Sequence, residues 1–317
     1  MDKSILEEKL TLPISFPDQD LWSTIGNTPL IRLQRLTDGF AESVEIYGKA
    51  EWFNPGSSVK DRPAAAILSK ALSNGLLKED RVFLDSSSGN MGIAYATLGA
   101  PLGIRVHIAI PSNAGPERLT ILRALGAELT LTDPLEGSEG ARVVAAEMAA
   151  ENPSLYYYAN QYSNPANWQA HYTTTGPEIL SQTNGRVTHF VAGLGTTGTL
   201  MGTGRYLREV LPDIRLVAVQ PDGPIHGLEG LKHLPTSNVP EIYEPTLPDE
   251  TIPVTTEQAY EMVRRLGKEE GLFVGISAAA AVVAALNLAK RIEEGVIVVV
   301  LPDSGMKYLH QPIWDVK

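Results

Sequence analysis

The sequence contains no cysteine among its 317 residues. Disulfides, thiolate metal sites and a cysteine nucleophile are therefore excluded. Histidine is scarce, and the six histidines show no spacing typical of metal ligands, so no metal site is expected. Long hydrophobic runs are also missing, because the longest strongly apolar strand-like run, residues 296–301, is far too short to span a bilayer.

Positive charge is in deficit, with 26 Lys and Arg against 37 Asp and Glu and a net charge of −11. This balance argues against nucleic acid or an anionic membrane as a partner, since both reward basic patches. A small anionic substrate is still compatible with it, because a local cluster of donors can override the global field. Residues 1–12 mix acids and lysines and lack the apolar stretch of a signal peptide, so a cytoplasmic protein is expected.

From about residue 81 the chain alternates β-rich runs with amphipathic segments, which implies parallel sheets with helices on both faces. The stretch 151–167, with its four tyrosines, is interpreted as a crossing between domains. We therefore predict two α/β domains, each with a largely parallel sheet flanked by helices: a small domain over residues 47–155 and a large domain formed by residues 1–46 and 156–317. The predicted strands are 81–85, 105–110, 128–132, 188–192, 215–220 and 296–301, and the main predicted helices are 116–125, 138–150, 200–210, 256–270 and 277–290.

The turn over residues 54–62, Asn-Pro-Gly-Ser-Ser-Val-Lys-Asp-Arg, places Lys60 among small residues at the entry to an apolar, helix-like run. A lysine in such a position loses solvent and lowers its pKa, as the amine of a Schiff base requires. Taken alone, the turn is explained equally well by a solvated lysine at an ordinary helix N-terminus.

Residues 193–199, Gly-Leu-Gly-Thr-Thr-Gly-Thr, follow the predicted strand 188–192 directly and open a helix. Glycines let backbone N–H groups converge, threonines add donors, and the helix N-terminus adds partial positive charge, so the run predicts a phosphate site. It matches neither the P-loop nor the dinucleotide-binding pattern, which disfavours a nucleotide. A tight strand-to-helix turn is the alternative.

Two further strand ends carry polar groups. The turn 86–90, Ser-Ser-Ser-Gly-Asn, opens a helix and would hold a carboxylate, although a helix N-cap is the alternative. The turn 302–305, Pro-Asp-Ser-Gly, places a hydroxyl where it could meet a heterocyclic nitrogen, or forms an ordinary β-turn. One lysine, two anion sites and a strand-end hydroxyl together suit pyridoxal phosphate with an amino-acid substrate.

With these motifs the sequence resembles the β-family (fold type II) of pyridoxal-phosphate enzymes, and within it the cysteine synthases, over nearly the whole chain. The runs 162–167, 175–178 and 188–205 are most similar to B-type enzymes, which include the O-phosphoserine sulfhydrylases. The resemblance implies a tryptophan synthase β-like fold, a homodimer and pyridoxal 5′-phosphate as cofactor. The motifs that carry it are 54–62, 87–90, 195–199, Gly275-Ile-Ser277 and 302–308.

The resemblance also implies roles for individual residues. Lys60 would bind the cofactor and then act as the base on the substrate Cα proton. Ser304 would place a neutral hydroxyl at the ring nitrogen, which does not hold the ring protonated and so favours loss of a β-leaving group. Because Asp303 is adjacent, the sequence leaves open which of the two residues meets this nitrogen. The phosphate would bind to Gly195, Thr196, Thr197, Gly198 and Thr199, the ring hydroxyl to Asn90, the ring nitrogen to Ser304, and the substrate to Ser87, Ser88, Gly89, Met91 and Gln161.

Departures from the family pattern leave the exact substrate open. Ser87 and Met91 replace the two threonines of the common Thr-Ser-Gly-Asn-Thr motif, and the hydroxyl lost at Met91 removes one donor. Lys232 aligns with an arginine that meets the substrate phosphate in O-phosphoserine-using enzymes. A lysine supplies the charge without the bidentate fork, and a solvated surface lysine is the alternative.

The reaction that we predict is synthesis of L-cysteine by replacing the β-substituent of O-phosphoserine or O-acetylserine with sulfide. Another β-family activity, such as serine dehydration or cystathionine or diaminopropionate synthesis, is the nearest alternative. A non-catalytic protein that binds a nucleotide or phosphosugar in the two anion sites, and a regulatory partner without turnover, are alternatives of other classes. The sulfur donor stays open among free sulfide, thiosulfate and the thiocarboxylate of a sulfur-carrier protein.

Overall fold

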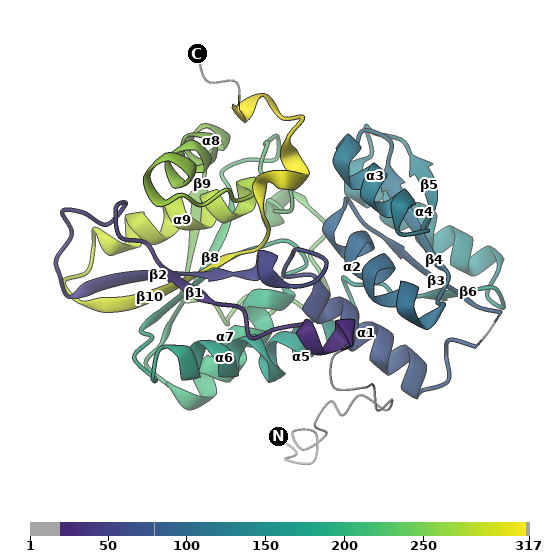
Figure 1. Ribbon diagram of the computed structural model, residues 1–317, viewed down its shortest axis with the longest axis horizontal. Helices are drawn as coiled ribbons and strands as arrows, with labels where there is room; N and C mark the ends of the chain where they lie inside the picture. The colour runs from purple at the N-terminus through teal and green to yellow at the C-terminus, as the bar shows by residue number, and fades with distance from the viewer. Residues whose placement is uncertain (1–19, 79, 315–317) are drawn as a thin grey trace.

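The computed structural model describes residues 20–78 and 80–314, and within these ranges the chain forms two α/β units, each built on its own sheet (Figure 1). The larger sheet has the order β1-β2-β10-β7-β8-β9 and the smaller one β5-β4-β3-β6. All pairings are parallel except the antiparallel pair β1–β2. The strands are β1 (Leu30–Arg32), β2 (Val44–Ala50), β3 (Val82–Ser86), β4 (Val106–Pro111), β5 (Glu128–Thr132), β6 (Tyr156–Tyr158), β7 (His189–Gly193), β8 (Arg215–Pro221), β9 (Glu250–Val254) and β10 (Gly295–Leu301).

Helices cover both faces of each sheet, which confirms the predicted class. In the larger unit α8 and α9 lie on one face and α5, α6 and α7 on the other (Figure 1). In the smaller unit α1, α2 and α3 pack on one face and α4 on the other. The helices are α1 (Asp61–Ser73), α2 (Asn90–Gly99), α3 (Pro116–Ala124), α4 (Gly137–Glu151), α5 (Ala166–Thr173), α6 (Thr175–Gln182), α7 (Gly198–Val210), α8 (Thr256–Arg265) and α9 (Ile276–Ala289).

The centre of the larger unit is made by β10 and α9. The valine-rich strand β10 is buried on both faces, as a central strand of a parallel sheet should be. Helix α9 is rich in alanine, the strongest helix former, and all but one of its residues are buried. Small side chains let this helix lie close to the sheet, so its first turn stands at a fixed place beside the end of β10.

The predicted polar turns all follow strand ends. The turn 54–60 follows β2, the loop 194–197 follows β7 and the turn 302–304 follows β10, three strands that are neighbours in the larger sheet. The turn 87–89 follows β3 of the smaller sheet. Because carboxyl ends of adjacent parallel strands meet at one edge, this order brings the three large-unit turns together.

Most predicted elements are present with ends shifted by a few residues, but five were missed. The missed elements are β1, β2, β6, α5 and β9. Strand β6 lies inside the stretch 151–167 and helix α5 begins within it, although the Asn, Pro and Tyr content of this stretch is typical of a loop. The three tyrosines of β6 form a strand because they pair with β3.

The strand pairing bears on the division of the chain. Strand β2 belongs wholly to the larger sheet and β6 to the smaller one. We therefore propose boundaries between the turn 54–60 and α1, and after Tyr158, where the sequence predicted limits of 47 and 155. In the described part of the chain no helix has both the length and the apolar character to cross a membrane. The segment 1–12, read above for a signal peptide, lies outside the described residues.

Candidate active site

Lys60 stands at the N-cap of α1, at the end of a turn that the neighbouring strand holds in place. The backbone N–H of Val59 donates to the Pro302 carbonyl at 2.8 Å, and Ser58 forms a β-bridge with Asp303. The Lys60 ammonium itself makes no hydrogen bond or ion pair with any residue in the ranges 20–78 and 80–314. The amine is therefore not held by a carboxylate and is free to react.

The electrostatic surroundings keep the pKa of Lys60 low. Burial lowers this pKa most, since the charged form loses its hydration. Asp303 acts in the opposite direction, while the nearby Lys307 lowers the pKa further. The net result is a pKa below the usual lysine value, so the unprotonated, nucleophilic form is favoured.

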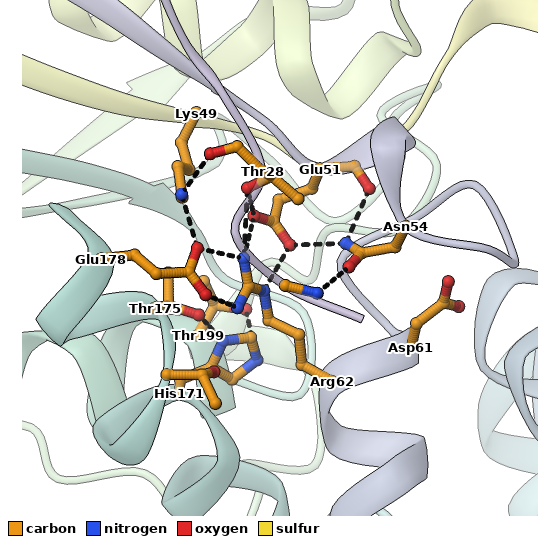
Figure 2. Close-up of polar contacts among 12 residues, drawn as sticks. Thr28, Lys49, Glu51, Asn54, Asp61, Arg62, His171, Thr175, Glu178 and Thr199 are labelled. Carbon is orange, nitrogen blue, oxygen red and sulfur yellow. Dashed lines mark hydrogen bonds and ion pairs between the residues drawn. The ribbon is translucent and has the colours of Figure 1, made fainter. Parts of the chain in front are cut away.

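A buried ion network anchors α1 two residues after Lys60 (Figure 2). Arg62 Nε donates to Glu51 Oε2 at 2.7 Å, and Arg62 Nη1 donates to Glu178 Oε1 at 2.6 Å. Lys49 Nζ donates to Glu178 Oε2 at 2.6 Å, so two cations balance two anions. Burial opposes ionisation of Glu178, but the Arg62 and Lys49 contacts prevail and hold its pKa at about 2. The network joins β2, α1 and α6 beneath the turn.

Asp61 closes the turn from the other side. Its Oδ2 accepts a hydrogen bond from the Gly56 backbone N–H at 2.5 Å, while Oδ1 is buried without a partner among the described residues. Burial raises the pKa of Asp61 to about 7. A Cβ at Gly56 would run into the Asp61 carboxyl group, so the glycine permits the close approach.

The loop after β7 has the form of an anion site. Within the described ranges the backbone N–H groups of Gly195, Thr196 and Thr197 donate no hydrogen bond, and the first N–H groups of α7 are free by the geometry of a helix. Thr197 adopts φ of +71°, and its buried hydroxyl has no partner in the part of the chain described. A Cβ at Gly195 would lie 2.5 Å from the Gly230 carbonyl oxygen, so this position requires glycine.

Neutral side chains form hydrogen bonds with the threonines of this loop. His171 Nε2 lies 3.3 Å from Thr199 Oγ1 and its Nδ1 lies 2.9 Å from Thr175 Oγ1. The ring lies beside Thr175 and Thr199 (Figure 2), and burial lowers the pKa of His171 to about 3, so the ring is neutral. Asn167 Nδ2 donates to Thr196 Oγ1 at 3.1 Å. The loop is thus shaped by hydrogen bonds, and its attraction for an anion comes from backbone N–H groups.

In the turn after β3, the Ser87 hydroxyl serves the turn itself. Ser87 Oγ accepts hydrogen bonds from the N–H groups of Gly89 and Gly92, each at 3.0 Å. Ser87 thereby satisfies one free N–H of the first turn of α2, although the N-cap residue itself is Gly89, which has no side-chain cap. The N–H groups of Ser88, Asn90 and Met91 donate no hydrogen bond to the described residues, and these groups form the candidate carboxylate site.

The remaining residues of the predicted substrate set differ in where their side chains lie. Ser88 is exposed, whereas Met91 is 2% exposed and packs in the core of the smaller unit. Gly89 has φ of +155°, and a Cβ there would collide with Arg118. Gln161 is buried, and its Nε2 donates to the Ser86 carbonyl at 2.6 Å. Met91 therefore faces the site through its backbone.

Asn90 links the two units. Its Nδ2 donates to Asp303 Oδ2 at 2.6 Å, and its Oδ1 accepts from Lys307 Nζ at 2.8 Å. The Tyr308 hydroxyl also donates to Asp303 Oδ2, at 2.7 Å. The motif 302–308 therefore meets the turn after β3, although 213 residues separate Asn90 from Asp303 in sequence.

Two serine hydroxyls stand free near the end of β10. Ser304 forms a β-bridge with Val274, and Ser277 is the second residue of α9, 6% exposed. Neither hydroxyl has a hydrogen-bond partner in the described chain. Ser277 was assigned no role from the sequence, although it lies in the Gly275-Ile-Ser277 motif.

Lys232 is not a solvated surface lysine. It is 8% exposed, forms an ion pair with Glu139 of α4, and lies 5.0 Å from the centre of the Tyr162 ring. Asn238 Nδ2 also donates to Glu139, at 2.8 Å. This pair crosses between the units, as does the pair of Arg118 with Glu229.

Sequence reasoning missed the roles of Arg118, His171 and Lys307. Arg118 donates to the Ser88 carbonyl at 2.9 Å and lies over the Tyr308 ring. Lys307 lies inside the motif 302–308, so the sequence marked its position but could not predict which groups it contacts. In the described ranges no group of three or more His, Asp or Glu side chains is arranged to hold a metal ion.

The residues present fit pyridoxal phosphate. An unpaired amine of lowered pKa suits covalent attachment to an aldehyde. Free N–H groups and the unpartnered Thr197 hydroxyl at the start of α7 suit a phosphate group. Asn90 keeps one amide N–H unused, which suits a ring hydroxyl.

Comparison with known proteins gives the same result. The sequence model of a family described as pyridoxal-phosphate dependent enzyme matches residues 21–303. A cysteine synthase of Aquifex aeolicus is 50% identical over 298 residues, covering 92% of this chain and 91% of that protein. Cysteine synthase B of Escherichia coli is 42% identical, covering 91% and 94%. A crystal structure of cysteine synthase from Entamoeba histolytica superposes with a TM-score of 0.89 at 37% identity, covering 96% of this chain and 94% of that one.

Proposed function

The chain belongs to the pyridoxal-phosphate dependent enzymes, and from this premise we propose that it is a cysteine synthase. It would replace the β-substituent of O-phosphoserine or O-acetylserine with sulfide and release L-cysteine. The observation that carries the proposal is the unpaired Lys60 amine, held at the strand edge where the two candidate anion sites also lie.

The cofactor would be held by residues from three turns of the larger unit and one of the smaller. Lys60 would bind it covalently, and Gly195 to Thr199 would hold its phosphate. The unused N–H of Asn90 would donate to the ring hydroxyl. Ser304 remains our candidate for the ring nitrogen, with Ser277 as a second candidate. Replacing each serine with alanine separates them, because loss of the nitrogen's partner shifts the absorbance maximum of bound cofactor.

When bound, pyridoxal phosphate draws electrons from the Cα of an attached amino acid, which makes the α-proton acidic and the β-substituent a leaving group. The N–H groups of Ser88, Asn90 and Met91 would hold the substrate carboxylate and so fix the Cα position. Lys60, whose pKa burial lowers from its ordinary value, would take the α-proton. Sulfide would then bond to Cβ in place of the departed acetate or phosphate, and Lys60 would return a proton to Cα.

The identity of the leaving group depends on Lys232. A cation there would favour O-phosphoserine, but in this structure its charge is matched by Glu139. The supporting geometry is the low exposure of Lys232 and its position on the segment that also supplies the Gly230 carbonyl against Gly195. We propose that both donors are accepted and that O-phosphoserine requires Lys232 to leave Glu139.

The sulfur donor and the partners are further parts of the proposal. Free sulfide, or the thiocarboxylate of a sulfur-carrier protein after hydrolysis, would supply sulfur at the oxidation level of cysteine. Thiosulfate would instead give S-sulfocysteine, from which a thiol reductant has to displace sulfite to leave cysteine. We propose a homodimer, as the family resemblance implies, and a cytoplasmic location. Size-exclusion chromatography with light scattering tests the dimer, and a monomer at micromolar concentration would overturn it.

Lys60→Ala tests the function directly. We expect wild-type protein to be yellow and to keep its cofactor covalently bound after borohydride reduction. Lys60→Ala should bind no cofactor covalently, and its rate of cysteine formation should fall by a factor of at least about 10³. Lys70→Ala, on the exposed face of the same helix, is the matched control and should behave as wild type. A colourless wild-type protein would favour the non-catalytic alternative, and cofactor attachment to Lys60→Ala would exclude Lys60 as the attachment site.

A further inference from the structure

Lys307 is a buried lysine outside the region matched by the family. It lies in the short helix Gly305–Tyr308 after β10, is 4% exposed, and follows the matched residues 21–303. Its three donors are all used: Nζ donates to the Gly56 carbonyl at 2.9 Å, the Ser57 carbonyl at 3.2 Å and Asn90 Oδ1 at 2.8 Å. In the described chain no carboxylate lies within ion-pair distance of this ammonium. A buried charge is costly without a paired anion, so its retention calls for a physical reason.

The first consequence concerns the orientation of Asn90. An amide can be turned over by 180° unless its partners distinguish oxygen from nitrogen. Lys307 can only donate, so it must face Oδ1, and Asp303 Oδ2 accepts from Nδ2 at 2.6 Å. The two contacts therefore fix the amide and leave one N–H of Nδ2 available.

The second consequence concerns the turn that carries Lys60. Lys307 binds two successive carbonyl groups of that turn, those of Gly56 and Ser57. Ser57 has φ of +60°, a conformation that a serine rarely adopts and that needs support from its surroundings. One ammonium thus joins the turn of the larger unit to Asn90 of the smaller unit.

The third consequence is electrostatic. The charged groups that act on Lys60 are Asp303, Lys307 and Glu51, and the buried His171 beside it is neutral. Those that act on Lys307 are Asp303, Asp61 and Arg118. Lys307 is therefore the cation that opposes protonation of Lys60, while Asp303 and, to a smaller extent, Glu51 favour it.

We propose that Lys307 is a positioning residue of the cofactor site, which aims the free N–H of Asn90 at the cofactor and keeps a second positive charge beside Lys60. The proposal rests on the proposed function, because it requires cofactor attached to Lys60. The structure assigns Asp303 the opposite electrostatic effect on the same nitrogen.

The test uses the holoenzymes of wild type, Lys307→Met, Lys307→Gln, Lys307→Arg and Asp303→Asn. Each is titrated across neutral and alkaline pH, and the visible absorbance of bound cofactor reports the proton on the Lys60–cofactor linkage. Cofactor retention is measured separately by equilibrium dialysis. Lys290→Met, at the exposed end of α9, is the control.

We expect the titration midpoint of Lys307→Met and Lys307→Gln to rise by about one pH unit, because a neighbouring cation no longer opposes the proton. Lys307→Arg should keep the wild-type midpoint, and Asp303→Asn should lower it. Cofactor binding should be about tenfold weaker in Lys307→Met, because Asn90 Oδ1 loses the donor that fixes its amide. Opposite shifts at the two positions cannot come from a general loosening of the fold.

An unchanged midpoint in both Lys307→Met and Lys307→Gln, with wild-type cofactor retention, would overturn the proposal. If Lys307→Met does not fold, Lys307→Gln and Asp303→Asn provide the same comparison. Titration midpoints that shift in the same direction in these two variants would also overturn the proposal. A wild-type protein without cofactor would overturn the proposed function instead, so the two failures are distinguishable.

Discussion

At the scale of single residues, the shape of the candidate phosphate loop depends on Gly195 having no Cβ. Gly195 passes so close to the Gly230 carbonyl that a methyl group has no room, and the obstacle is backbone, which cannot rotate away. The loop would have to move for any other residue, and its converging N–H groups would move with it.

Gly195→Ala is therefore expected to weaken cofactor binding by at least about tenfold, because misplaced donors lose hydrogen bonds to the phosphate, each worth on the order of 1 kcal/mol or more. The measurement is cofactor dissociation by fluorescence titration. Gly223→Ala is the control, since a Cβ there meets nothing within 4 Å. Equal affinities for the two variants would show that the loop tolerates the shift.

Asp85 gives a residue-level prediction for pH. It is fully buried on β3, and burial raises its pKa from 3.8 to about 7 despite hydrogen bonds from the Ser86 N–H and the Tyr95 hydroxyl. The folded state then binds more protons than the unfolded state between these two values, so this group makes stability fall as pH rises from about 4 to about 7.

Asp85→Asn should remove that fall. Relative to wild type, the free energy of unfolding of the variant should rise by on the order of 2 kcal/mol between pH 5 and pH 8. Urea unfolding at the two pH values measures it. Glu178, whose pKa is about 2, does not interfere because it titrates below this window. Parallel pH profiles for wild type and variant would contradict the prediction.

At the scale of elements, α1 is held by charge as well as by its apolar face. Arg62 is fully buried and contacts Glu51 and Glu178, on β2's continuation and on α6 respectively (Figure 2). Removing one partner from such a network leaves the others uncompensated in a site with little water.

Arg62→Met should therefore lower the free energy of unfolding by about 3–5 kcal/mol, since Glu51 would remain buried without its main partner. Arg265→Met, which breaks the exposed pair with Glu269 on the surface, should cost less than about 1 kcal/mol. Urea denaturation of both variants makes the comparison. Similar losses for the two would mean that the network does not anchor the helix.

At the scale of the whole molecule, the two units are joined by polar contacts around the site. Lys232 pairs with Glu139, Arg118 with Glu229, and His310 with Glu117, each across the two units. Such contacts hold the units in one relative position and can be exchanged for substrate contacts when a charged donor binds.

Glu139→Gln tests that exchange. It releases the Lys232 charge, so affinity for O-phosphoserine should rise several-fold while affinity for O-acetylserine stays within about twofold. The absorbance change of bound cofactor on adding each donor, without sulfide, gives both affinities. Glu128→Gln, an exposed carboxylate of the smaller unit, is the control. Equal changes for both donors would mean that the pair only holds the units together.

Local pattern in the sequence determined much of this protein. Alternating apolar strands and helices predicted the α/β class, and small and hydroxyl residues after the strands marked the turns of the site, because turn chemistry and periodicity are properties of neighbouring residues. The same pattern singled out Lys60, Gly195 and Asn90 as candidates for the site. It could not find β2 or β6, whose strand character comes from pairing with β10 and β3.

Tertiary structure alone decided which charged groups meet. Lys307 contacts Gly56 and Asn90 across 251 and 217 residues of sequence, and Lys232 contacts Glu139 across 93. These partners follow from the sheet order, which sets β10 beside β2, and from the packing of the smaller unit against the ends of these two strands. Burial and charged neighbours are set in space, so the lowered pKa of Lys60 and the fixed orientation of Asn90 arise only in the folded chain.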